Sequence, residues 1–166
     1  MMEYTIRPYR DGEERYIADL HTRIYTEEYS WGPAFTYYAG KIALDFADKA
    51  KSEREAMYIA ETDGVPVGCI MLCETDDTDI GQLRLFAVEK EHRRRGVGKA
   101  LMDALTEKAK SAGYKGLILW TADPLKEAIR IYESYGFKET ETVPNDTWRT
   151  DGGTVHEIKM ELHGLA

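Results

Sequence analysis

The stretch "LRLFAVEKEHRRRGVGKALMDAL", residues 83–105, decides how the rest of the chain is interpreted. It begins as an apolar strand ending at Val88, passes through an arginine-rich turn, and enters a helix with apolar residues at helical spacing. Gly96 and Gly98 stand at the mouth of that helix, where backbone N–H groups lie at the positive end of the helix dipole. The stretch predicts an anion site, and a diphosphate fits it best.

The residue types of the turn agree with this interpretation. A Cβ at the two glycines would keep a phosphate from the backbone, and three arginines, 93–95, add positive charge at the rim together with Lys99. The alternative is that the arginines only solvate a helix start and the glycines only shape a turn. Two known phosphate motifs are excluded, because Ala100 stands where a P-loop has Ser or Thr and no complete G-x-G-x-x-G is present.

Length and composition limit the class of protein. The 166 residues suit one compact domain, 1–166, and the net charge of −8 opposes sequence-independent binding to nucleic acid. No apolar stretch has the length of a membrane span, so we expect a cytoplasmic protein with no membrane partner. The four histidines show no metal-ligand spacing. Cys69 and Cys73 lie four residues apart in a predicted strand, too far for a disulfide, and are expected to be free and buried.

Strand and helix patterns alternate along the chain. Asp63-Gly64 predicts a hairpin between two strands. Asp123 is expected to cap a helix that ends at Gly136, and Gly113 is expected to end the helix before it. The other predicted strands are 4–7, 80–88, 116–120, 137–143 and 154–162, and the other predicted helices are 11–29 and 33–51.

Two segments resemble one known family. Arg93-Arg94-Arg95-Gly96-Val97-Gly98, after a strand ending in Val, resembles the central signature of the GCN5-related N-acetyltransferases (GNAT). "AIRIYESYGF", residues 128–137, is similar to the A-x-x-x-Y-x-x-x-G-F segment of that family. More narrowly, "IYTEEYSWG" and "LWTADPLKEAIRIYESYGF" resemble the acetyltransferase domains found fused to MarR-type regulators.

The resemblance implies a fold and a place for the cofactor. The fold would be a single α/β (α+β) GNAT-like domain, with a central mixed, mostly antiparallel sheet of about seven strands flanked by about four helices. Acetyl-CoA would lie where the fourth and fifth strands separate, with its pyrophosphate on backbone amides and its pantetheine along the fourth strand, where one amide would face the thioester oxygen. The implied cofactor-binding residues are Phe86, Ala87, Val88, Arg93, Arg94, Arg95, Gly96, Val97, Gly98 and Lys99.

The resemblance also implies roles in catalysis. Tyr132 corresponds to the tyrosine of the family that protonates the departing sulfur, and a phenol with a pKa of about 10 stays protonated near neutral pH. Its place on an apolar helical stripe would equally suit a core residue. The base is open between Glu28 and a chain of water molecules. Tyr25, Tyr29 and Trp31 would line the substrate pocket with Glu28.

Arg84 is a charged residue within an apolar strand and needs a partner. Glu28 and a substrate carboxylate are both candidates, so Arg84 is included among the predicted substrate-binding residues.

We expect an acetyl-CoA-dependent N-acetyltransferase that acts on a primary amine of a small molecule by direct attack in a ternary complex. Two alternatives remain: an acetyltransferase for a peptide or protein amine, and a non-catalytic CoA-binding or sensing module. Leu125, in place of an Asn common in the family, permits the second. A nucleotide-binding switch is weaker, because no magnesium-binding residue follows the arginine turn. Exposed tyrosines of the first two predicted helices could line a pocket or form a homodimer contact.

Overall fold

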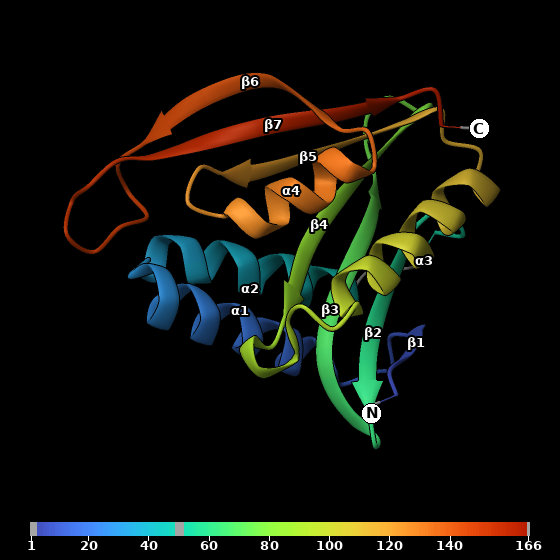
Figure 1. The fold of residues 1–166 in the computed structure, drawn as a ribbon, viewed down its shortest axis with the longest axis horizontal. Helices are drawn as coiled ribbons and strands as arrows, with labels where there is room; N and C mark the ends of the chain where they lie inside the picture. The colour runs from blue at the N-terminus through green and yellow to red at the C-terminus, as the bar shows by residue number, and fades with distance from the viewer. Residues whose placement is uncertain (1–2, 49–51, 166) are drawn as a thin grey trace.

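The computed structural model describes residues 3–48 and 52–165, which form a seven-stranded sheet covered by helices on both faces (Figure 1). Strand order across the sheet is β1-β2-β3-β4-β5-β7-β6. The strands are β1 (Thr5–Pro8), β2 (Ala56–Thr62), β3 (Val65–Glu74), β4 (Ile80–Val88), β5 (Gly116–Ala122), β6 (Lys138–Asn145) and β7 (Val155–His163). The helices are α1 (Glu14–Tyr29), α2 (Pro33–Asp48), α3 (Val97–Ser111) and α4 (Lys126–Ser134), with a short 3₁₀ turn at Lys90–His92.

The β4–β5 junction creates the opening on which the site depends. These two strands pair in parallel, whereas the other described strand pairs are antiparallel. The pairing stops after Gln82 and Ile118, although β4 continues to Val88. Beyond that point no strand of the described residues pairs with β4 on its β5 side, and the two strands separate (Figure 1).

The sheet separates two hydrophobic cores. On β3, Cys69, Met71 and Cys73 face the core formed with α1 and α2, whereas Ile70 and Leu72 face the core formed with α3. This period of two is what strand geometry requires of a sheet that is buried on both faces. Both cysteines are buried thiols outside any disulfide of the described residues, as predicted.

Two helix starts differ from their predictions, and the first is α1, which begins at Glu14 rather than at residue 11. Asp123 does not cap α4, because its carboxylate accepts the backbone N–H of His156 at 3.0 Å and so joins β5 to β7. The helix begins at Lys126 after Leu125, which provides no side-chain cap. The end of the second predicted helix, 49–51, lies outside the described residues. In the part of the chain that the structure describes, no helix is long and apolar enough to span a bilayer.

Candidate functional site

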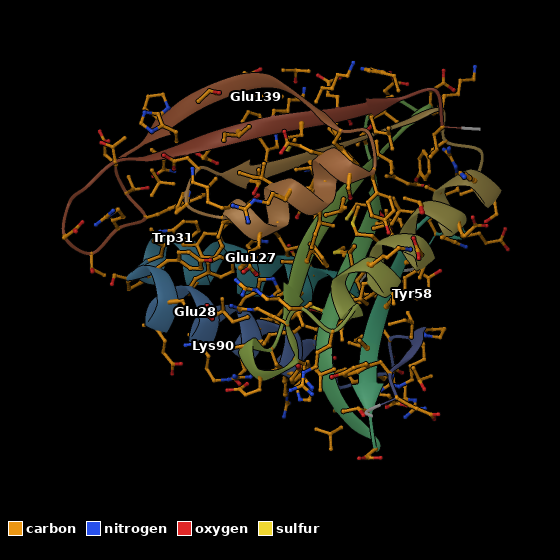
Figure 2. The ribbon with its side chains drawn as sticks, in the orientation of Figure 1. Glu28, Trp31, Tyr58, Lys90, Glu127 and Glu139 are labelled. Atoms are coloured by element: carbon orange, nitrogen blue, oxygen red, sulfur yellow. The ribbon has the colours of Figure 1, made fainter. Side chains whose placement is uncertain are left out.

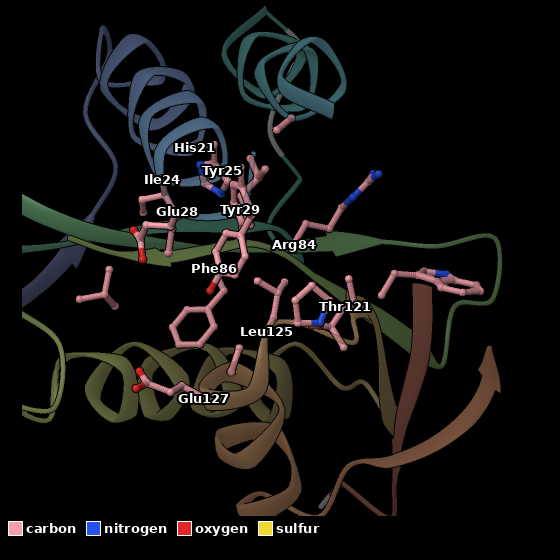
Figure 3. Close-up of a pocket in the computed structure, with 18 of the residues that line it drawn as sticks. His21, Ile24, Tyr25, Glu28, Tyr29, Arg84, Phe86, Thr121, Leu125 and Glu127 are labelled. Carbon is pink, nitrogen blue, oxygen red and sulfur yellow. The ribbon is translucent and has the colours of Figure 1, made fainter. Parts of the chain in front are cut away.

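A cavity of about 660 Å³ opens where β4 and β5 separate (Figure 3). Its walls come from α1, the α1–α2 junction, α2, β4, the bend between β4 and α3, the first turn of α3, β5, α4, β7 and the loop between β6 and β7. Of the predicted site residues, those that line it are Tyr25, Glu28, Tyr29, Trp31, Arg84, Phe86, Ala87, Val88, Arg93, Arg94, Gly98 and Tyr132. The fold therefore brings most of the predicted cofactor, substrate and catalytic residues to one place, whereas Arg95, Gly96, Val97 and Lys99 lie outside the cavity lining.

The bend between β4 and α3 leaves backbone donors free for a ligand. Gly96 has a left-handed backbone with φ 85°, and its carbonyl accepts the first bond of the helix, from the Ala100 N–H at 3.0 Å. The amides of residues 97–99 precede that bond, and Gly96 has no side chain with which to cap them. A Cβ on Gly96 would meet no atom within 4 Å, so this side of the bend is open. Free donors at an open helix start suit a phosphate group.

Gly98, unlike Gly96, is needed for close packing. A Cβ at this position would come within 3.2 Å of Phe86 Cζ and 3.3 Å of Ile131 Cδ1. Its lack of a side chain lets α3 begin directly against β4 and α4. Gly98 therefore holds the bend beside the cavity.

The cations of the predicted rim have different partners in the structure. Arg93 turns inward: its Nε donates to the Val88 carbonyl at 3.0 Å, and its guanidinium holds Glu28 in a bidentate ion pair at 2.5 and 2.8 Å. This hydrogen bond to Glu28 raises the pKa of Arg93. Arg94 pairs with Glu127 of α4 at 2.7 Å, and Lys99 pairs with Asp103 at 2.8 Å.

The two arginine pairs connect the bend to helices on either side. Figure 2 shows Glu28 and Glu127 reaching the same region from α1 and α4. Arg95 and Lys99 stay at the exposed rim, outside the cavity lining.

A bulge turns the backbone of β4 at the cavity. Cys69 lies opposite Ala87 and Met71 opposite Arg84, so two steps on β3 match three on β4. The bulged segment of β4 contains Leu85, whose backbone has φ 52°. This left-handed conformation is costly for a leucine. The Cys69 thiol donates to the Leu85 carbonyl at 3.1 Å. Because the C=O and N–H of a trans peptide point in opposite directions, the Phe86 amide points away from Cys69.

Tyr132 combines burial with a free hydroxyl. It lies on α4, is 5% exposed and lines the cavity, with its ring 5.9 Å from that of Phe86 between centroids. Burial raises its pKa above the usual value for a phenol, so the proton is retained at neutral pH. Within the described residues, the hydroxyl has no hydrogen-bond partner. The group is therefore a proton donor without an internal acceptor.

Four aromatic residues with their rings in mutual contact form one side of the cavity, here called the aromatic wall: Tyr25, Trp31, Phe35 and Trp148. Contacting rings lie 4.6 to 5.0 Å apart between centroids. Trp148 comes from the loop between β6 and β7, which is held to the α1–α2 junction by the bond from the Gly32 N–H to the Trp148 carbonyl. Its role was not predicted, because the contact joins segments more than a hundred residues apart.

Arg84 does not pair with Glu28, so that expectation is wrong. Arg93 occupies both oxygens of Glu28, and Arg84 extends instead toward α2, where its Nη2 donates to the Tyr38 hydroxyl at 2.7 Å. Figure 3 shows Glu28 and Arg84 on different sides of the cavity.

His21 is a lining residue that sequence reasoning missed. Its Nδ1 lies 2.8 Å from the Ile17 carbonyl and must carry the proton, which leaves Nε2 as an acceptor. Nε2 is buried and has no partner among the described residues. Burial lowers the pKa of His21 from 6.5 to about 4, so the ring is neutral near pH 7.

Comparisons with known proteins agree with this geometry. The model of the acetyltransferase (GNAT) family matches residues 14–137. Mouse N-acetyltransferase 8 is 31% identical over 136 residues, which cover 76% of this chain and 60% of that protein. Human N-acetyltransferase 8 is 34% identical over 107 residues, which cover 60% of this chain and 47% of that protein. The chain spans about half the length of several of the curated relatives it matches.

A solved structure with a similar fold is a putative acetyltransferase from Salmonella typhimurium, determined with its cofactor acetyl-CoA. Its TM-score is 0.76 at 17% identity, over 97% of this chain and 94% of that chain. The seven-stranded mixed sheet with four helices is therefore the fold of GNAT structures.

Proposed function

We propose that this chain, which belongs to the GNAT acetyltransferase family, transfers an acetyl group from acetyl-CoA to the primary amine of a small molecule in a ternary complex. Acetyl-CoA is the acetyl donor of this family. The observation that carries the proposal is the cavity at the β4–β5 junction, which has unpaired β4 backbone on one side and unbonded α3 amides at its end.

The chain's backbone fits the donor in two places. The amides of Gly96 to Lys99 would hold the pyrophosphate, with Arg95 and Lys99 at the rim. The unpaired stretch from Phe86 to Val88 would pair with the pantetheine arm as an added strand. The Phe86 amide would donate to the thioester oxygen, where negative charge grows during attack.

Two side-chain roles follow for the transfer itself. Acetyl-CoA supplies an acetyl group already activated as a thioester. The N–C bond forms as the C–S bond breaks, and Tyr132 would give its proton to the departing sulfur. The unpartnered hydroxyl at the cavity supports that role, and burial, which raises the pKa of Tyr132, keeps the proton on the phenol until a thiolate forms.

Removal of the amine's proton is assigned to a chain of water molecules rather than to Glu28. Both oxygens of Glu28 accept from Arg93, whose Nε also holds the Val88 carbonyl. Glu28 is therefore proposed to position the bend on which the pyrophosphate would lie.

The experiment has two stages. Calorimetry first measures binding of acetyl-CoA, and a panel of small primary amines then tests transfer by release of the CoA thiol and by the mass of the products. Tyr132→Phe is expected to lower kcat about 100-fold and to leave acetyl-CoA affinity within twofold, since the ring is kept. Binding of acetyl-CoA without transfer to any amine would favour the non-catalytic CoA-binding module, and transfer to peptides alone would favour a peptide or protein acceptor. Equal rates for both forms would remove Tyr132 from the mechanism.

Three finer predictions belong to this proposal: a relation to MarR-fused acetyltransferase domains, a homodimer, and a cytoplasmic location.

A further inference from the structure

We infer that the acceptor amine carries a carboxylate, which Arg84 and Tyr38 bind at one side of the cavity, and an apolar side chain that packs on the aromatic wall. The inference rests on the proposed function and names the substrate class of the same site. An amino acid with a large apolar side chain is the simplest molecule of this kind.

The charge balance of the cavity lining distinguishes Arg84 from the other cations. Arg93 is neutralised by Glu28 and Arg94 by Glu127. Lys90 and Lys126 are exposed, where water solvates an ammonium group well. Arg84 differs from all of these: it is half-buried, and no carboxylate among the described residues lies within ion-pair distance. A half-buried cation without a counterion is suited to an anion that arrives with a ligand.

Tyr38 adds a second hydrogen-bond donor beside the Arg84 guanidinium. Its oxygen accepts an N–H from Arg84 at 2.7 Å, so its own hydrogen remains to be donated. That hydrogen has no acceptor in the part of the chain described. Arg84 keeps further N–H groups in the planar arrangement that matches a carboxylate. Two donors from β4 and α2 therefore converge, and Tyr38 is 47% exposed, so a ligand can reach them.

Two other parts of the cavity lining match the amine and the apolar side chain of the acceptor. Glu157 of β7 lines the same cavity, is half-buried, and accepts only from the neutral Asn145 side-chain amide at 3.0 Å. This carboxylate without a cation favours the arrival of an ammonium group, as Arg84 favours a carboxylate. The aromatic wall of the same cavity offers apolar surface. The cavity thus matches a zwitterion with an apolar body better than a simple alkylamine.

Matched amines test the substrate class. Phenylalanine is compared with phenethylamine, and 6-aminohexanoate with hexylamine, because each pair shares its amine and differs in the carboxylate. The inference expects kcat/KM to be at least about 10-fold higher for the carboxylate-bearing member of at least one pair. No preference in either pair, or a preference for the member without the carboxylate, would overturn it.

Variants test whether the preference for carboxylate-bearing amines depends on Arg84. Arg84→Met is expected to remove the preference by raising KM for the carboxylate-bearing amine about 10-fold or more, while the simple amine changes less than twofold. Tyr38→Phe should remove part of it. Lys126→Met is the matched control, since it takes one positive charge from the same cavity and should leave the preference intact. If Arg84→Met slowed both members of a pair equally, the residue would be structural and the inference would be wrong.

A binding measurement separates this inference from the proposed function. Calorimetry compares N-acetylphenylalanine with N-acetylphenethylamine, and needs no turnover. Tighter binding of the acetylated amino acid to the native chain, lost in Arg84→Met, supports the carboxylate site even if no amine is acetylated. Equal affinities would contradict the carboxylate site even if acetyl transfer is observed.

Discussion

The thiol of Cys69 fixes the direction of one backbone amide at the cavity. It holds the Leu85 carbonyl on one side of β4, and the Phe86 amide consequently points to the other. Leu85 has a left-handed backbone, so the peptide needs support to keep this orientation. Burial raises the pKa of Cys69, which keeps the thiol protonated as a donor.

Cys69→Ala is therefore expected to lower kcat about 10-fold, a part of the loss seen when an oxyanion donor is removed completely. KM for acetyl-CoA should change little, because the bend at α3 is untouched. Cys69→Ser keeps a donor and should retain most of the activity. Cys73→Ala, on the same face of β3, is the control for loss of a buried thiol. Steady-state kinetics decide the matter, and identical behaviour of the Ala and Ser variants would contradict the role.

Glu28 is the residue whose expected and proposed roles can be separated most clearly. The bidentate pair with Arg93 predicts that Glu28→Gln raises KM for acetyl-CoA several-fold, because the bend loses its charged connection to α1. The dependence of kcat on pH should stay the same. Loss of the acidic limb of the pH–rate profile in this variant would instead identify Glu28 as the base.

At the scale of elements, the start of α3 can be compared with its end. Gly96 and Gly113 have nearly the same left-handed backbone, φ 85° and 87°, and a Cβ on either would meet no atom within 4 Å. Substitution of either by Ala should cost about 1 to 2 kcal/mol of folding stability. Only Gly96 lies where the pyrophosphate would approach.

Gly96→Ala should accordingly weaken acetyl-CoA binding about 10-fold or more, whereas Gly113→Ala should leave it unchanged. Thermal unfolding checks that the two variants have similar stability, and calorimetry compares their affinities for acetyl-CoA. Equal affinities for the two variants would contradict a site at the start of α3.

The buried histidine of α1 makes folding stability depend on pH. The pKa of His21 falls from 6.5 to about 4 on folding because burial disfavours the charged ring. Between these values the unfolded chain binds more protons than the folded one, so stability is full above about pH 6.5 and is lost as the pH falls toward 4.

The expected loss of unfolding free energy between pH 7 and pH 5 is about 2 kcal/mol. Urea unfolding at the two pH values measures it, and His21→Leu, which fills the same space without a titrating group, should lose about 2 kcal/mol less over this interval. The same pH dependence in both proteins would show that His21 does not contribute.

Elements were predictable where local pattern determines them. β4 was predicted with the bounds it has, since a mostly apolar segment bounded by an acidic loop and a charged turn specifies a strand. The predicted N-cap at Asp123 failed because the carboxylate bonds to β7. Trp148 was missed because its partners come from the α1–α2 junction and from α2. The pairing of Glu28 with Arg93 likewise depends on how α1 crosses the sheet.

At the scale of the whole molecule, the cavity joins two parts that have separate cores. One core lies under α1 and α2 and the other under α3, with the sheet between them. Two ion pairs connect α1 to the end of β4 and the bend, Arg23 with Glu89 and Glu28 with Arg93. Arg93 and Arg94 of the basic turn are each balanced by a carboxylate of this acidic chain, Glu28 and Glu127, so the backbone amides at the start of α3 are its main donors for an anion.

The most direct test of the account follows individual backbone amides by ¹H–¹⁵N NMR while acetyl-CoA is added. The account predicts that the largest shifts occur at Gly96, Val97, Gly98 and Lys99, with a second group at Phe86 to Val88, because these donors would contact the pyrophosphate and the pantetheine arm. Saturating acetyl-CoA that leaves the amides at the start of α3 unshifted, or that shifts only amides elsewhere in the chain, would contradict it.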